Sequence, residues 1–164
     1  MKKILRLQSA MLKEIDKYEK LIPERSHFID WERVHISSCA KLCYVLAEQR
    51  GVDPIIAAAA GTVHDYGRII TGKQGGHAEA GYLPVQEFLR GTGLFNDEEI
   101  AEIAEAVRNH SKKGEIGTPL EEVVKDADVL DFYQYGYDVA NRAQQERLER
   151  LLGHKVKGLK FSEE

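Results

Sequence analysis

The ten residues from Pro54 to Val63 contain no charged side chain, and His64 and Asp65 follow them directly. The preceding Asp53 favours a helix start here, because Asp is a good N-cap and Pro suits the first helical position. A helix with apolar residues on all sides must be buried. The run is far shorter than the roughly 18 residues that a membrane span needs. We therefore expect a central core helix that ends on two titratable side chains.

Most of the remaining sequence has helical periodicity as well. Apolar residues recur at steps of three and four from Ile4 to Ile22, which predicts a first helix ending before Pro23. A second helix is predicted over residues 26–49, with Gly51 as its C-terminal cap. Further helices are predicted over about 77–90, after a capping-box start at Asn96, after Thr118, and over about 138–152. Gly67 and residues 71–76 are expected to form a loop.

No segment has the pattern of a strand, and a chain of 164 residues is the size of one domain. The predicted fold is therefore all-α, a single-domain helical bundle. We expect an accessory helix in residues 1–25, the core in residues 26–136, and a C-terminal helix and tail of the same domain in residues 137–164.

The charge balance narrows the range of partners. The chain has 23 Lys and Arg against 27 Asp and Glu, a formal charge of −4, which argues against stable nucleic-acid binding and against an anionic membrane surface. A small phosphorylated ligand held by a few local cations remains compatible with this balance. Cys39 and Cys43 lie four residues apart in a predicted helix and are poorly placed for a disulfide, so we expect a reducing, cytoplasmic compartment.

Several titratable side chains fall where the core is expected. His35 lies on one helical stripe with Trp31, Val34 and Cys39, and His110 follows an apolar stripe at helical spacing. A single histidine on such a face is more often a hydrogen-bonded core residue than a metal ligand. Several isolated core histidines would each need a separate partner, however, whereas one divalent cation satisfies them together. Imidazole and carboxylate ligands suit Fe, Mn, Zn or Ni.

The predicted helix after Thr118 offers three candidate carboxylates. Asp126 and Asp128 lie about equally far from its apolar stripe on opposite sides, and Asp131 lies closer to the centre of the stripe. Periodicity alone does not choose among the three.

The ordered set of motifs resembles the HD-domain superfamily of metal-dependent phosphohydrolases over about residues 30–136. The matching segments are Arg33-Val34-His35, residues 63–68 around His64-Asp65, residues 76–81 around His77, residues 107–111 around His110, and residues 125–128 ending in Asp128. The resemblance implies a five-helix core in which His35, His64, Asp65 and Asp128 hold one metal ion. It also implies that His77 and His110 hold a second metal ion, with Asp65 as the bridge.

Phosphate-ester hydrolysis fits this set of metal-binding residues, because a bound cation lowers the pKa of water towards 7 and so supplies hydroxide. His64, Asp65 and Arg68 are the predicted catalytic residues. Three cations near the ligands are predicted to bind substrate phosphate: Arg33, Arg68 and Lys112. For each of them the alternative is a solvated surface charge.

The expected function is hydrolysis of a small phosphate ester, as a phosphomonoesterase, a phosphodiesterase or a dinucleoside polyphosphate hydrolase. A nucleotide is the favoured substrate, and one or two divalent ions of Fe, Mn, Ni or Zn are the expected cofactor. The stretch His64-Asp65-Tyr66-Gly67-Arg68 is also similar to that of the superfamily's diadenosine tetraphosphate hydrolases. Two alternatives stay open, namely a mixed-valent di-iron oxygenase with the same ligands and a non-catalytic nucleotide-binding signalling module. The oligomeric state also stays open, with a homodimer among the options.

Overall fold

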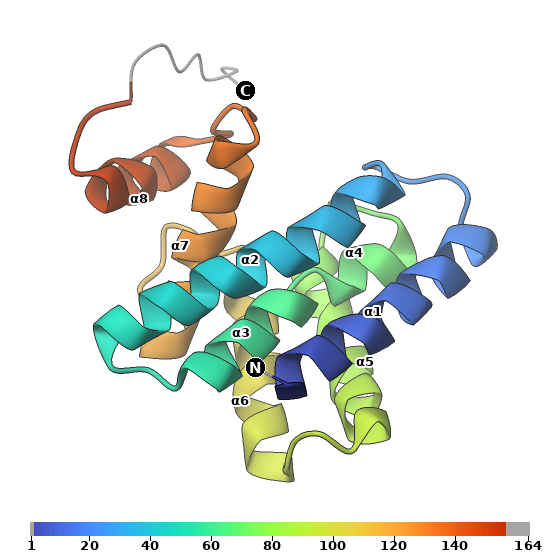
Figure 1. Ribbon diagram of the computed structural model, residues 1–164. Helices are drawn as coiled ribbons and strands as arrows, with labels where there is room; N and C mark the ends of the chain where they lie inside the picture. Colours follow the sequence, from blue (N-terminus) through green and yellow to red (C-terminus); the bar gives the residue numbers. More distant parts are fainter. Residues whose placement is uncertain (1, 157–164) are drawn as a thin grey trace.

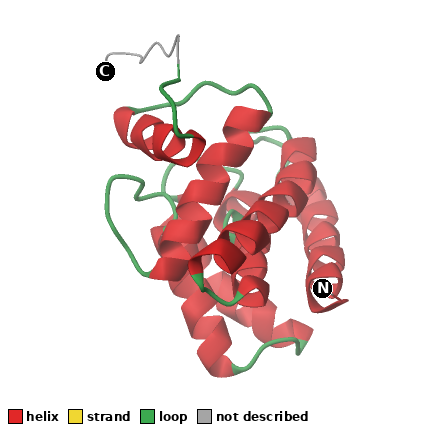
Figure 2. Ribbon diagram, turned by 60° about the vertical axis from the view of Figure 1, so that its left-hand side comes forward, coloured by secondary structure: helices red, strands yellow, loops and turns green. Residues whose placement is uncertain are grey.

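The structure is a computed structural model, and it describes residues 2–156. These residues form eight helices and no strand (Figures 1 and 2), which confirms the all-α prediction. The helices are α1 (Lys2–Leu21), α2 (Ile29–Arg50), α3 (Pro54–Val63), α4 (Tyr66–Thr71), α5 (His77–Thr92), α6 (Asp97–Asn109), α7 (Pro119–Gln134) and α8 (Arg142–Leu152). Within the described part of the chain, no helix combines the length and the hydropathy needed to cross a bilayer.

The apolar run forms helix α3 at the centre of the bundle. The carboxylate of Asp53 caps it by accepting hydrogen bonds from the backbone N–H groups of Ile55 (2.8 Å) and Ile56 (3.1 Å). The whole stretch from Ile56 to Val63 is buried, and α3 contacts α1, α2, α6 and α7. Its last turn therefore delivers His64 and Asp65 into the interior.

Two glycines let α4 and α5 approach each other closely. A Cβ atom on Gly67 would lie 1.9 Å from the carbonyl oxygen of His77, and one on Gly81 would lie 2.9 Å from the nitrogen of Gly67. The expectation that Gly67 lies in a loop was wrong, because it lies inside α4 and the connection to α5 begins at Gly72. Here glycine serves close helix packing, and it does not end the helix.

The buried face of α2 differs from the predicted stripe. Val34, expected in the core beside Trp31, is 44% exposed, whereas Glu32 is buried. The core-facing side of α2 carries Glu32 and His35 together with Ile36 and Cys39. Glu32 and His35 are buried because they have polar partners on other helices. Apolar periodicity alone therefore does not predict which face of α2 is buried.

Helix α8 packs on α7, on the side of the bundle away from α1 (Figure 1). Its buried Arg147 donates hydrogen bonds to the carbonyl oxygen of Lys113 (2.6 Å), to Glu122 (2.7 Å) and to Asp126 (2.9 Å). One guanidinium thus joins α8, α7 and the segment between α6 and α7. This arrangement fixes the walls of the cavity described below.

Candidate metal centre

Two buried imidazoles from α2 and from the end of α3 face each other. The Nε2 atoms of His35 and His64 are 3.0 Å apart. Their other ring nitrogens are engaged, since His35 Nδ1 donates to Asp131 Oδ2 (2.6 Å) and His64 Nδ1 donates to the carbonyl oxygen of Gly61 (2.8 Å). Each Nε2 is therefore the ring nitrogen that can bind a cation once its proton has left, and the two atoms face each other.

Two carboxylate oxygens complete this group. Asp128 Oδ1 lies 3.2 Å from His35 Nε2 and 3.6 Å from His64 Nε2. Asp65 Oδ2 lies 3.5 Å and 3.1 Å from the same two nitrogens. The structure thus brings together the four residues that the family resemblance assigns to a first metal ion.

The donor set fits a divalent transition-metal ion. Two nitrogens that bind one cation at about 2.1 Å and at a right angle are about 3.0 Å apart, which is the separation of the two Nε2 atoms. Among the described residues, no group makes a well-aligned hydrogen bond to the buried Oδ1 atom of Asp128, whose near neighbours are the two imidazoles. A cation at this point would satisfy that oxygen, and imidazole with carboxylate is a common ligand set for Fe, Mn, Ni and Zn.

A second pair of imidazoles lies on the other side of Asp65. The Nε2 atoms of His77 and His110 are also 3.0 Å apart, and Asp65 Oδ1 lies 3.0 Å and 3.5 Å from them. Their Nδ1 atoms donate to the carbonyl oxygens of Gln74 and Val107, each at 2.6 Å. The two histidine pairs therefore share one carboxylate, which offers one oxygen to each pair.

Burial and the many charged neighbours shift the pKa values of the aspartates and histidines at this centre. Burial disfavours the carboxylate of Asp128, but Lys113 and the two nearby histidines hold its pKa well below the usual value. Burial also lowers the pKa of His110 to about 4. Asp128 is therefore ionised and His110 neutral near pH 7, and these are the forms that bind a cation. Burial opposes a charge on His35, yet the three nearby aspartates raise its pKa well above the usual value, so a cation must displace a proton there.

The structure gives each of the three aspartates of α7 a different partner. Asp128 faces His35 and His64. Asp131 accepts hydrogen bonds from His35 Nδ1 and from the hydroxyl of Ser38 (2.8 Å), so it fixes the orientation of the imidazole. Asp126 pairs with Arg50 (2.8 Å) and with the α8 guanidinium, away from the histidines. Of the three, Asp128 is therefore the one whose carboxylate lies beside the Nε2 atoms of both imidazoles.

Arg68 lies beside Asp65, as its spacing predicted, but its guanidinium is fully engaged. Nε and Nη2 donate to the carboxylate of Glu32 at 2.7 Å and 3.1 Å, Nη2 also donates to Asp65, and Nη1 donates to Gln74 Oε1 at 3.0 Å. Arg68 is buried with Glu32. Its evident task is to hold Asp65 in place, and the predicted grip on phosphate would require it to leave two carboxylates.

The other two predicted phosphate-binding cations lie away from the centre. Arg33 pairs with Glu19 (2.7 Å), Asp16 (2.9 Å) and Asp30 (2.9 Å) at the contact between α1 and α2. Lys112 is exposed, and its ammonium donates to Asn109 at 2.9 Å. Neither side chain lines the cavity beside the histidines, so the prediction is corrected for both.

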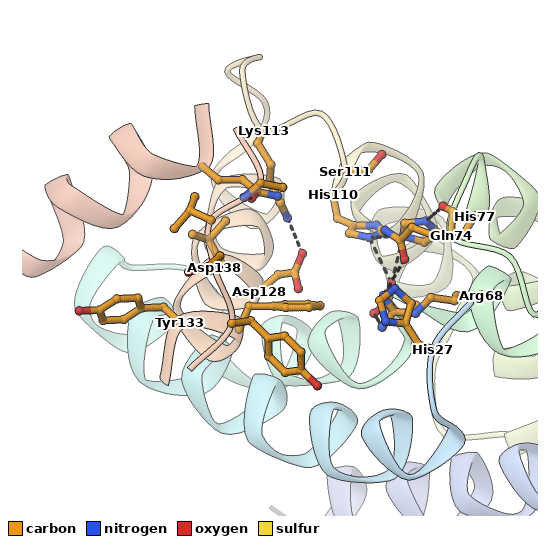
Figure 3. A pocket seen from close by; sticks show the side chains of 17 residues that line it. His27, Arg68, Gln74, His77, His110, Ser111, Lys113, Asp128, Tyr133 and Asp138 are labelled. Atoms are coloured by element: carbon orange, nitrogen blue, oxygen red, sulfur yellow. Dashed lines mark hydrogen bonds and ion pairs between the residues drawn. The ribbon is translucent and has the colours of Figure 1, made fainter. Parts of the chain in front are cut away.

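A cavity of about 350 Å³ lies beside the centre, and its lining includes His77, His110, Asp65 and Asp128 (Figure 3). Figure 3 shows Lys113 joined to Asp128 on one side and His77 with His110 on the other. The wall contains residues that the sequence reading did not single out for the site, namely His27, Gln74, Ser111, Lys113, Val129, Phe132, Tyr133, Tyr137, Asp138, Val139, Ala140 and Gln144. Lys113 could have been suspected, because it directly follows the predicted Lys112. Nothing in the sequence pattern around the aromatic wall residues distinguishes them from ordinary helix and loop residues, so their place in the cavity could not be predicted.

Cys39 is an alternative ligand that the structure argues against. Its sulfur lies within 4.8 Å of ligand atoms of His35 and His64. A hydrogen bond with Cys43 and burial both raise the pKa of the Cys39 thiol well above its usual value. Because the thiolate is the form that binds metal, the carboxylates are the better partners for these histidines.

A family model, the HD domain, matches residues 34–133, which is more than half of the chain. The protein belongs to the HD-domain family, whose members are in general metal-dependent phosphohydrolases. The matched range contains all six predicted metal ligands, but it excludes His27 and the cavity wall from Tyr137 to Gln144. Searches of curated proteins and of solved structures return no match.

Proposed function

We propose that this protein is a phosphohydrolase that uses two divalent cations to hydrolyse a small phosphate ester, with a nucleotide as the favoured substrate. The observation that carries the proposal is the placement of a histidine pair on each side of Asp65, one pair at each carboxylate oxygen. His35, His64, Asp65 and Asp128 would hold one cation, and His77, His110 and Asp65 would hold the other. Paired cations sharing a carboxylate are typical of phosphoester hydrolysis.

Bound cations supply an acidified water and neutralise the charge that develops on the phosphoryl oxygens. In the overall reaction the oxygen of one water joins phosphorus and the ester P–O bond breaks. The bonding electron pair goes to the leaving oxygen, which takes up a proton. An alcohol and inorganic phosphate result.

The chain's own residues keep the ligands in position for this work. Arg68 fixes one oxygen of Asp65 and is itself fixed by Glu32. Lys113 holds Asp128 Oδ2 at 2.6 Å, which leaves Oδ1 directed at the histidines. Both contacts are charge-assisted and buried, so each restricts its carboxylate to one orientation. The cavity wall limits the access of bulk water to the centre.

Metal analysis combined with a panel of phosphate esters tests the proposal. The purified full-length chain, loaded with Mn, Fe, Ni or Zn, should hydrolyse at least one small ester, and chelation should abolish the activity. His64→Ala should lose both metal and activity, whereas His154→Ala, a change at an exposed histidine that does not line the cavity, should lose neither. A chain that binds none of these metals contradicts the proposal. Oxygen uptake by an iron-loaded chain that cleaves no ester would instead identify a di-iron oxygenase.

The expected compartment and partners remain part of the proposal. The two cysteines are buried and unbridged, which supports a reducing location such as the cytoplasm. The acidic balance of the chain supports a small-molecule substrate over nucleic acid.

A further inference from the structure

The cavity contains little positive charge that is free to meet a substrate. Among its described lining residues the cations with fixed charge are Arg68 and Lys113. The first faces Glu32 and Asp65, and the second faces Asp128 at 2.6 Å. One phosphate at the metal centre would be neutralised by the cations bound there. Within residues 2–156, no further Lys or Arg lines the cavity to meet a second or third phosphate.

One part of the cavity wall is apolar and aromatic. Phe132 and Tyr137 contact each other with ring centroids 5.4 Å apart, and Val129 and Val139 continue the same wall. Aromatic faces hold flat ring systems by stacking. The cavity volume of about 350 Å³ lies near the lower end of the range for small-molecule sites, so it suits one compact group.

An acidic residue stands beside this wall. Asp138 lines the cavity, is exposed, and lies on the segment between α7 and α8, outside the range of the family match. A carboxylate here repels any additional phosphate that extends past the metal centre. It has no such effect on an uncharged leaving group.

We propose that the cavity selects esters with a single phosphate and a flat, uncharged leaving group, such as nucleoside monophosphates or aryl phosphates. Tyr137 contacts the leaving group, and Asp138 rejects polyphosphates. This inference rests on the phosphohydrolase function proposed above. It places selectivity in the segment after α7, which is not part of the matched HD domain.

The first test compares substrates on the metal-loaded wild-type chain. Adenosine monophosphate and p-nitrophenyl phosphate should have higher kcat/KM than adenosine diphosphate, adenosine triphosphate, diadenosine tetraphosphate and glycerol phosphate. Equal or better turnover of the polyphosphates overturns the charge argument. Equal turnover of glycerol phosphate overturns the stacking argument. If none of these esters is hydrolysed by a chain that holds its metal, the proposed function fails and this inference fails with it.

The second test changes the wall. Tyr137→Ala should raise KM for p-nitrophenyl phosphate by about 5-fold or more with unchanged metal content, because a stacking surface is lost. Tyr137→Phe should restore the wild-type KM. Tyr135→Ala is the matched control, since Tyr135 also packs edge-on against Trp31 but does not line the cavity. A KM unchanged in Tyr137→Ala, or raised equally in Tyr135→Ala, contradicts the assignment.

The third test changes the charge. Asp138→Lys should raise the kcat/KM ratio of adenosine diphosphate to adenosine monophosphate by about 2- to 5-fold, the size expected for one exposed charge, and high salt should reduce the gain. Calorimetry with non-hydrolysable phosphonate analogues of the two nucleotides should show the same change in relative Kd. An unchanged ratio in both measurements would show that Asp138 does not select substrates.

Discussion

Asp65 Oδ1 lies 3.0 Å from His77 Nε2, while its Oδ2 lies 3.1 Å from His64 Nε2. One buried carboxylate thus faces two histidine pairs that come from different parts of the bundle. This relationship makes Asp65 the junction of the site. Any group that orients Asp65 should affect both halves of the centre together.

Arg68 is the group that orients Asp65 most directly. Arg68→Lys keeps the charge but loses the two-point contact with Glu32, so kcat should fall by about 10-fold or more while KM for the ester changes little. This split is expected because Arg68 acts through Asp65 and does not grip the substrate. Steady-state kinetics at saturating metal measure it. A rise in KM with unchanged kcat would return Arg68 to the phosphate-binding role that the sequence suggested.

Asp131 should raise the metal affinity of the centre through its hydrogen bond with His35, although it is not itself a proposed ligand. Asp131→Ala removes the carboxylate that accepts from His35 Nδ1, so metal affinity should fall by roughly 10- to 100-fold. Ser38→Ala removes only a hydroxyl that donates to Asp131 and should have a smaller effect. Metal titrations of both variants, with circular dichroism to verify folding, test the ranking. A metal affinity that Asp131→Ala leaves unchanged would show that the contact has no influence on the metal.

Gly67 should be intolerant of any side chain. Gly67→Ala places a Cβ atom 1.9 Å from the backbone oxygen of His77, so we expect a loss of about 1–3 kcal/mol or more in the free energy of unfolding. Gly75→Ala is the control, because a Cβ atom there meets nothing within 4 Å. Urea unfolding of the metal-free proteins compares the two variants. Equal stability of Gly67→Ala and the wild type would contradict the close packing of α4 and α5.

Glu122 should contribute to acid stability. Burial disfavours its charged form, but contacts with Arg147, the Gly117 N–H and Lys125 lower its pKa to about 2 from an ordinary value of 4.5. Because the folded-state pKa is depressed, the contribution is fully present above about pH 4.5 and is lost as the pH falls toward 2. Glu122→Gln should therefore flatten the decline of the unfolding free energy between these pH values. Parallel curves for the variant and the wild type would exclude this role.

The sequence predicted the helices well, because apolar periodicity and caps such as Asp53 and Asn96 act locally. The proposed ligand set came from the family resemblance, and the fold places those six side chains close together. The prediction of a loop at Gly67 was wrong because this glycine permits close packing of α4 against α5. Sequence rules for turns consider only neighbouring residues and do not include such contacts between helices.

Partners distant in sequence account for the other differences. The contact of Arg68 with Glu32 joins residues 36 positions apart, and no spacing rule links them. The roles of Asp126, Asp128 and Asp131 likewise depend on which helix each one meets. The cavity wall after α7 consists of residue types that are common on any surface, so its place beside the metal centre emerges only from the fold.

The number of metal ions bound to the His110→Ala variant tests the two-cation centre most directly. The wild-type chain should bind two ions, and His110→Ala should keep the ion held by His35, His64 and Asp128 while losing the other. Its turnover should fall by at least about 100-fold, because one of two cations that stabilise the transition state is missing. Elemental analysis of the wild type and the variant, loaded and desalted side by side, gives the result. Two ions per chain in the variant, or no ion at all, would contradict a centre divided between the two oxygens of Asp65.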